Sequence, residues 1–273
     1  MTLPRLKEML YWINEREAMR VRKEAGEKWP FSKDPIMAAN RFTNVMREDD
    51  KVTKWLAENW RTPHSKHENL PTAMVLARMV NYIPSLQAIG YPLTWQPISI
   101  LAALKARAAT GAKVWSSAYM ITTCGKRMGK EEYVVYWVCD NAMPLNEKIM
   151  AASTLQEAYN LLRKVDGLGS FLAAQVIADL KNTAGTSLSQ APDWHSWSAP
   201  GPGSLKGLSA FWGITVTPSN YEFCITEAWA TLKPELPAEL QNLGMQDLQN
   251  CFCEFSKYAR IKDGTGRARN GYR

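Results

Sequence analysis

The chain has 273 residues, of which 46% are hydrophobic and 22% charged, and its net charge is +7. This composition suits a globular protein of one large domain or two lobes. No run of about 18 apolar residues occurs, which excludes a membrane span. The N-terminus has scattered charges and no cleavage site for a secretory signal. We therefore expect an intracellular protein without a membrane partner.

The cysteines and histidines form no recognisable disulfide or metal pattern. The five cysteines are odd in number and lack framework spacing, so we expect reduced thiols. Cys251 and Cys253 have no second ligand pair nearby, and the three histidines do not form a zinc set. We predict no metal site and expect no cofactor.

The first half of the chain favours helices. Residues 4–26 are rich in helix formers, and Gly26 is expected to end that helix. Asp34 followed by Pro35 is typical of a helix start, so we expect a helix through IMAANRFTNVMRED. Further helices are predicted over residues 51–60, 70–84 and 98–109.

The second half contains the only β-leaning segments. Residues 114–124 and 131–140 flank the turn-like GKRMGK, which indicates a short β-hairpin or, alternatively, irregular structure. Residues 183–218 are rich in Gly, Pro, Ser and Trp, and loops of this length are usually functional or misassigned. The fold is therefore predicted to be mainly α, with an ordered active-site loop at 183–218. Helices are expected over residues 146–163, 169–182, 219–232 and 245–259.

The stretch VDGLGSFLAAQVIADL predicts a tight turn followed by a helix. It fits a helix-hairpin-helix pattern over residues 161–182. Glycines leave backbone amides exposed, and amides at a helix N-terminus bind anions such as a DNA phosphate. We expect Ser170 to cap the second helix. The alternative is a simple turn between two helices. The turn residues are assigned to DNA binding: Gly167, Leu168, Gly169 and Ser170.

The last segment, residues 257–273, is strongly basic. It holds one acid, Asp263, against six cations: Lys257, Arg260, Lys262, Arg267, Arg269 and Arg273. It is either a solubilising tail or an arm that follows a phosphate backbone. In the second case we expect Arg260, Arg267 and Arg269 to bind DNA.

The turn and its surroundings resemble the hairpin of the helix-hairpin-helix DNA glycosylases. In that superfamily an essential aspartate follows the hairpin at the edge of a base-accepting pocket. The resemblance points to Asp193, since Asp179 lies inside the predicted helix. Phe171 or a neighbour holds the place of the lysine found in bifunctional members, so lyase chemistry is not implied. The resemblance also admits a monovalent cation at the hairpin.

Five ordered motifs resemble a phage family of thymidine hypermodification: 14–16, 34–50, 111–122, 201–208 and 253–260. This family includes amino acid:DNA transferases, proposed α-glutamyl/putrescinyl-thymine pyrophosphorylases and the helical domain of 5-hydroxymethyluracil DNA kinases. It implies a single two-lobed, glycosylase-like domain over residues 1–273, acting in the cytoplasm of the infected host cell. No GxxxxGK[ST] loop occurs, so the chain is not expected to be the kinase by itself.

The resemblance implies a transferase that replaces the phosphate of 5-phosphomethyl-deoxyuridine in DNA with an amino acid or amine. Its partners would be double-stranded DNA containing modified deoxyuridine and a free amino acid, with glycine as one candidate. Base flipping would bring the pyrimidine into a pocket. Two alternatives stay open: a monofunctional glycosylase that excises a modified pyrimidine, and a non-catalytic DNA-binding partner of the kinase.

The candidate catalytic residues are Asp193 and three residues of the motif at 34–50, namely Arg41, Asn44 and Arg47. Arginine binds a departing phosphate in a bidentate way. Arg41, Asn44 and Arg47 are spaced by three, so on a helix they share one face. The alternative is an exposed face with ordinary ion pairs. Four residues are assigned to substrate binding: Arg16, Lys206, Glu254 and Lys257.

The sequence GPGSLKG, residues 201–207, is a second predicted loop with exposed backbone. We expect it to wall the pocket near Asp193 or to cradle a phosphate, with Lys206 as a point charge. Gly201 and Gly203 are therefore assigned to DNA binding. The alternative is a rigid turn fixed by proline.

Overall fold

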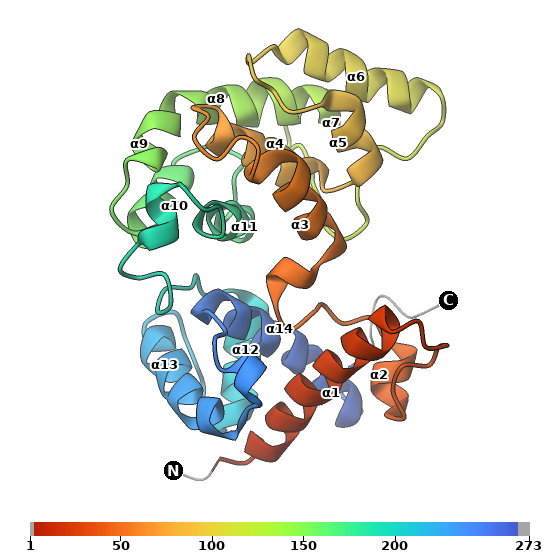
Figure 1. Cartoon of the computed structure of the whole chain (residues 1–273), viewed down its shortest axis with the longest axis vertical. Helices are drawn as coiled ribbons and strands as arrows, with labels where there is room; N and C mark the ends of the chain where they lie inside the picture. The colour runs from red at the N-terminus through yellow and green to blue at the C-terminus, as the bar shows by residue number, and fades with distance from the viewer. Residues whose placement is uncertain (1–2, 267–273) are drawn as a thin grey trace. The chain divides into compact units, whose positions relative to one another are not determined.

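The computed structural model describes residues 3–266, and the chain forms two compact units (Figure 1). The terminal unit consists of residues 1–50 and 195–273, and the central unit of residues 51–194. The described residues form helices and contain no β-strand, which confirms the mainly α prediction. Within the same residues, no helix is long and apolar enough to cross a membrane.

The central unit is built around α4 (Leu70–Val80), in which every residue is buried. It packs against α11 (Ser170–Lys181), α9 (Asn146–Met150) and the π-helix η3 (Tyr133–Cys139). A helix buried on all sides marks the centre of a core. The other helices of this unit are α3 (Lys51–Leu56), η2 (Ala57–Arg61), α5 (Ile83–Ile89), α6 (Pro97–Ala109), α7 (Lys130–Glu132), α8 (Asp140–Ala142), η4 (Met143–Leu145), α10 (Leu155–Leu162) and η5 (Ser187–Gln190).

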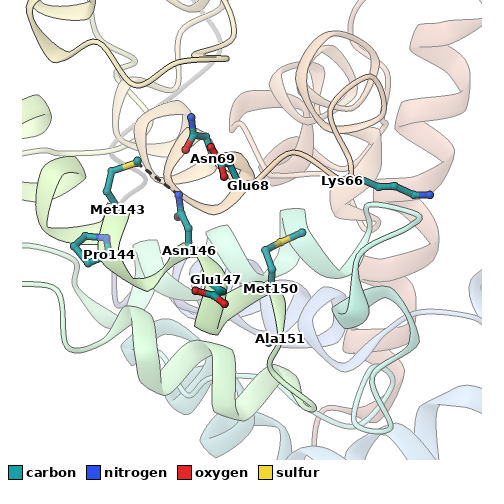
Figure 2. A pocket seen from close by; sticks show the side chains of 9 residues that line it. All are labelled: Lys66, Glu68, Asn69, Met143, Pro144, Asn146, Glu147, Met150 and Ala151. Carbon is teal, nitrogen blue, oxygen red and sulfur yellow. Dashed lines mark hydrogen bonds between the residues drawn. The ribbon is translucent and has the colours of Figure 1, made fainter.

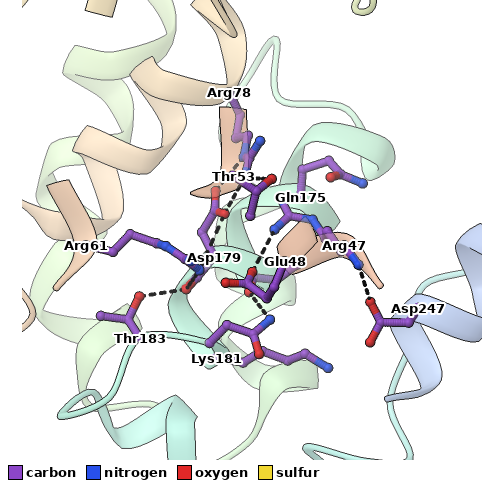
Figure 3. A network of polar contacts seen from close by, with 12 residues as sticks. Arg47, Glu48, Thr53, Arg61, Arg78, Gln175, Asp179, Lys181, Thr183 and Asp247 are labelled. Atoms are coloured by element: carbon purple, nitrogen blue, oxygen red, sulfur yellow. Dashed lines mark hydrogen bonds and ion pairs between the residues drawn. The ribbon is translucent and has the colours of Figure 1, made fainter. Parts of the chain in front are cut away.

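A buried ion pair ties α4 to α11 (Figure 3). Arg78 donates to both carboxylate oxygens of Asp179, at 2.6 Å from Nε and 2.5 Å from Nη2. Arg61 at the end of η2 donates to the main-chain oxygen of Asp179 at 3.1 Å. These three side chains are at most 2% exposed, and buried charges are tolerated when they are paired in this way. In the sequence, Arg78 and Asp179 each stand as a single charged residue inside an apolar stretch, which is the pattern that indicates a buried pair.

The terminal unit contains a close contact between α12 (Pro202–Trp212) and α14 (Met245–Lys262). A Cβ on Gly203 would overlap the Sγ of Cys253, and a Cβ on Gly207 would overlap the carbonyl oxygen of Phe252. The two glycines therefore let the helices approach closely. The other helices of this unit are α1 (Leu6–Glu24), α2 (Pro35–Ala39), η1 (Arg47–Asp49), α13 (Tyr221–Leu232), η6 (Lys233–Glu235) and η7 (Ala238–Leu240).

The prediction of exposed loop backbone at 201–207 is wrong, and so is a continuous loop over 183–218. Residues 202–212 form α12, with Gly201 as its cap and Pro202 in its first turn. The Gly201 N–H donates to Ser204 Oγ at 3.0 Å, which closes that turn. Proline at the first helical position is a helix-start signal. Gly203 faces α14, where it has a packing role.

The predicted β-hairpin is also wrong. Residues 130–139 form α7 and η3, whereas residues 111–129 form an irregular loop. The helical segment begins after Gly129, whose N–H donates to Glu132 Oε2 at 3.2 Å. Most of the β-branched and aromatic residues of η3 are buried. Packing in the core has therefore outweighed their β propensity.

The helix predicted from Pro35 is much shorter than expected. Asp34 caps it as predicted, because Oδ1 accepts from Ile36 N at 2.7 Å and Met37 N at 3.1 Å. However, α2 ends at Ala39, and residues 40–46 are not helical. A helical face shared by residues 41, 44 and 47 therefore does not exist.

Candidate functional site

The turn between α10 and α11 lies where the sequence predicts it (Figure 1). Leu168 is 2% exposed, and its N–H donates to Val165 O at 3.1 Å. Arg163 Nη1 donates to Leu168 O at 2.9 Å. The apolar residue between the two glycines thus anchors the turn in the core, and the glycines on either side have different surroundings.

Gly167 is required by the packing beneath the turn. Its φ of +89° is in the left-handed region, which side chains rarely adopt. A Cβ there would overlap the hydroxyl of Tyr133 and lie 2.9 Å from Val138 Cγ2. Gly167 therefore fits the turn onto η3, which is a structural role.

Gly169 is the open position of the turn. It is exposed, and nothing lies within 4 Å of a Cβ built on it. Gly169 is the N-cap of α11 and no side chain caps this end, so the prediction that Ser170 is the cap is wrong. Ser170, the first helical residue, is exposed as well. The first-turn N–H groups and the positive end of the helix dipole therefore face an accessible surface, a geometry suited to anions.

Charged and aromatic groups flank the turn. Asp166 accepts from Trp137 Nε1 at 3.0 Å and pairs with Lys126 Nζ at 3.5 Å. Lys126 also lies 3.9 Å above the Trp137 ring. The turn thus carries a carboxylate, Asp166, whose charge is balanced by Lys126.

Asp193 lies at the opposite end of α10 from this turn. Its Oδ1 accepts from Leu155 N at 2.8 Å and its Oδ2 from Gln156 N at 3.1 Å. The carboxylate thus caps the N-terminus of α10, whereas the glycine turn follows its C-terminus, about 12 Å away along eight residues. This geometry does not support the predicted catalytic role beside the hairpin. Leu155 and Gln156 lie 38 and 37 residues before Asp193, so the sequence pattern by itself does not show this capping role.

Segment 40–46 lies along α14 in the terminal unit. Glu254 Oε2 accepts from Thr43 N at 3.3 Å, and Lys257 donates to the carbonyl oxygen of Arg41. Lys257 and Glu254 also form an ion pair at 3.6 Å. The two predicted substrate-binding residues of α14 therefore meet the predicted catalytic segment.

Arg16 joins this group from α1. It is 9% exposed and donates to Phe42 O at 3.2 Å and to Asn44 Oδ1. Asn44 Nδ2 donates to Asp49 O at 2.7 Å, and the N–H of Arg47 donates to an oxygen of Asp247 at 2.9 Å. Tertiary contacts therefore bring together six of the predicted residues, of which Arg41 and Arg47 take part through main-chain atoms: Arg16, Arg41, Asn44, Arg47, Glu254 and Lys257. We call this group the α14 cluster.

Two thiols adjoin the α14 cluster. Burial raises the pKa of Cys253 to about 11, with Glu254 as a second cause, and raises that of Cys251 well above its usual value. Both thiols therefore stay protonated near neutral pH, and thiolate chemistry at this cluster is not favoured.

The remaining predicted residues do not join either group. Lys206 is exposed on α12, and Arg260 is exposed near the end of α14 with its Nε 3.3 Å from Ser256 O. Arg267 and Arg269 lie outside the described residues, so their role in DNA binding stays a prediction. Within residues 3–266 no group of three or more His, Cys, Asp or Glu side chains could hold a metal ion.

A pocket of about 660 Å³ lies elsewhere in the central unit (Figure 2). Its lining combines the charged residues Lys66, Glu68 and Glu147 with Met143 and Met150. No predicted site residue lines it. Its buried Asn146 accepts hydrogen bonds from Thr72 N at 3.1 Å and Oγ1 at 2.8 Å, so this amide oxygen serves the fold.

Comparisons with known proteins agree with the five-motif resemblance. The model of the family described as "5-hmdU DNA kinase, helical domain" matches residues 4–267. A 5-hmdU DNA kinase of Bacillus phage SP10 is 24% identical in an alignment of 283 positions, which covers 91% of this chain and 44% of the kinase. The chain thus spans less than half the length of this relative, and no solved structure matches it. The chain belongs to the family of 5-hmdU DNA kinase helical domains.

Proposed function

We propose that this chain is a DNA-binding module of thymidine hypermodification, acting in the cytoplasm of a phage-infected cell. Its turn between α10 and α11 binds DNA that contains modified deoxyuridine. The observation that carries this proposal is the open N-terminus of α11 at Gly169. Its family membership supplies the DNA context.

The proposed contact is to the phosphate backbone. Amides at a helix N-terminus complement a phosphate without reading the base sequence. Arg163 and Lys164, both exposed, precede the turn and add positive charge. Affinity should therefore vary little with base sequence and fall as the salt concentration rises, because phosphate binding releases counterions.

Gly169 allows a sharp test of this contact. Aspartate and asparagine have the same shape, both are good N-caps, and the open space at Gly169 accepts either. Gly169→Asp adds a negative charge where the phosphate would bind, so its affinity for duplex DNA should be about tenfold lower than that of Gly169→Asn, a difference of roughly 1.4 kcal/mol. Equal affinities of the two folded variants, measured by fluorescence anisotropy, would contradict the proposal.

A second candidate function is amino acid transfer onto the modified base, supported by the α14 cluster. In this reaction the donor amine attacks the exocyclic methylene of 5-phosphomethyl-deoxyuridine. The C–N bond forms with the lone pair of the amine, the C–O bond to phosphate breaks, the phosphate leaves with the electron pair of that bond, and the ammonium so formed loses a proton to water. Arg41 and Arg47 suit the phosphate, and Glu254 suits the donor ammonium. Glycine is one candidate donor.

The transfer reaction has a direct test. The protein is incubated with duplex DNA containing 5-phosphomethyl-deoxyuridine and a mixture of amino acids, and the DNA is then digested to nucleosides for mass spectrometry. A new amino-linked nucleoside supports transfer, and its loss in Glu254→Gln supports the α14 cluster. Free base with an abasic site indicates a glycosylase. Bound but unchanged DNA leaves the DNA-binding module as the function.

A further inference from the structure

The loop of residues 111–129 touches both sides of the turn between α10 and α11. On one side, Lys126 pairs with Asp166 at 3.5 Å. On the other side, the Tyr119 ring meets the Phe171 ring edge to face, with centroids 5.0 Å apart. Gly167 to Ser170 lie between Asp166 and Phe171 in the sequence, so the loop contacts the chain on both sides of the turn. We call the loop and the turn together the loop surface.

This surface exposes apolar side chains. Met120 is 83% exposed and Phe171 is 55% exposed. Single exposed apolar residues are common, but here Met120 directly follows Tyr119, whose ring contacts Phe171 of α11, and the loop is too long to be a simple connection. Tyr119 is held in place, since its hydroxyl donates to Gln175 Oε1 at 3.3 Å. The surface thus offers flat apolar groups on a fixed base.

The loop adds positive charge to this surface, against one carboxylate of the turn, Asp166. Residues 111–130 contain four cations and no acidic residue. Two of the lysines lie over tryptophan rings, Lys126 at 3.9 Å from the Trp137 centroid and Lys130 at 4.4 Å from that of Trp115. Aromatic rings interleaved with cations are the combination that binds single-stranded nucleic acid, with rings for the bases and cations for the phosphates. A duplex hides the faces of its bases and would use only the charges.

We infer that this loop surface binds unpaired DNA bases by stacking, beside the phosphate held at Gly169. The ligand is therefore a locally unpaired strand, with Phe171 and Met120 in contact with the base faces and Lys126 near the adjoining phosphate. The inference rests on the proposed DNA-binding function and specifies its substrate.

The test compares three fluorescein-labelled DNAs of one sequence: a single strand, a duplex, and a duplex with one bulged nucleotide. The wild type should bind the single strand and the bulge more tightly than the duplex. The variant Met120→Ala/Phe171→Ala should lose about fivefold or more of the affinity for the two unpaired DNAs and less than about twofold for the duplex. Phe223→Ala is the matched control, because Phe223 is 65% exposed on α13 in the terminal unit.

The outcomes separate this inference from the proposed function. If the double variant binds all three DNAs like the wild type while Gly169→Asp weakens binding, the stacking surface is refuted and the hairpin contact stands. If the wild type shows no preference for unpaired DNA, the inference is also overturned. If no DNA binds at all, both the inference and the proposed function fail.

Discussion

Arg78 and Asp179 form a bidentate ion pair inside the central unit, with two nitrogen–oxygen distances of 2.6 Å and 2.5 Å. Arg78 comes from α4 and Asp179 from α11, 101 residues later in the chain. The helix that carries the open N-terminus at Gly169 is therefore fastened at its other end to the centre of the core.

Removing one partner of this pair should destabilise the protein strongly. In Asp179→Ala the buried Arg78 loses its carboxylate, which costs about 3–5 kcal/mol in comparable buried pairs. The melting temperature measured by circular dichroism should fall sharply. Lys105→Ala is the control, because the Lys105–Glu132 pair is exposed and such pairs add little to stability. Similar melting temperatures for the two variants would show that the buried pair is not important for stability.

The two glycines of the turn should respond differently to alanine. Gly167→Ala should cost about 1–3 kcal/mol, because its backbone is left-handed and its Cβ would overlap the Tyr133 hydroxyl. Gly169→Ala has open space and an ordinary backbone angle, so it should cost less than about 1 kcal/mol. Chemical denaturation of both variants measures the difference, and a larger loss in Gly169→Ala would contradict the packing described for the turn.

The capping role of Asp193 predicts a modest loss of stability without a loss of DNA binding. Asp193→Ala removes the acceptor of two N–H groups of α10 and should cost about 0.5–2 kcal/mol. Thermal unfolding and DNA-binding assays on the same sample provide the check. A folded Asp193→Asn protein that binds DNA normally but forms no product would instead support the catalytic role implied by the glycosylase resemblance.

His64 should make the stability depend on pH. Burial lowers its pKa, with His67 as a second cause, and its ring stacks on Tyr91 at a centroid distance of 3.7 Å. The unfolded chain therefore binds a proton more readily than the folded one, so stability is complete above the unfolded pKa of about 6.5 and declines as the pH falls below it. The melting temperature of the wild type should drop more between pH 7 and pH 5 than that of His64→Gln. Melting temperatures that fall equally with pH in the two proteins would exclude a contribution of His64 to the pH dependence.

The sequence determined most helices and the turn between α10 and α11 by local rules. The Asp34-Pro35 cap and the Gly-Leu-Gly turn depend on neighbouring residues, so both could be located from sequence alone. The family membership also followed from ordered motifs. Local patterns did not determine segment 40–46, whose backbone bonds to side chains of α14 more than 200 residues away.

Tertiary packing decided the elements that local patterns misassigned. Residues 133–139 have β-forming side chains, but their burial in the central unit favours a helix. Gly203 and Gly207 have the composition of a loop, yet they serve a close contact between α12 and α14. The roles of the site residues also depend on long-range contacts. Asp193 caps α10, and Arg16 donates a hydrogen bond to Asn44, and neither role follows from the type of the residue. Local propensity is worth tenths of a kcal/mol per residue, and burial and pairing outweigh it.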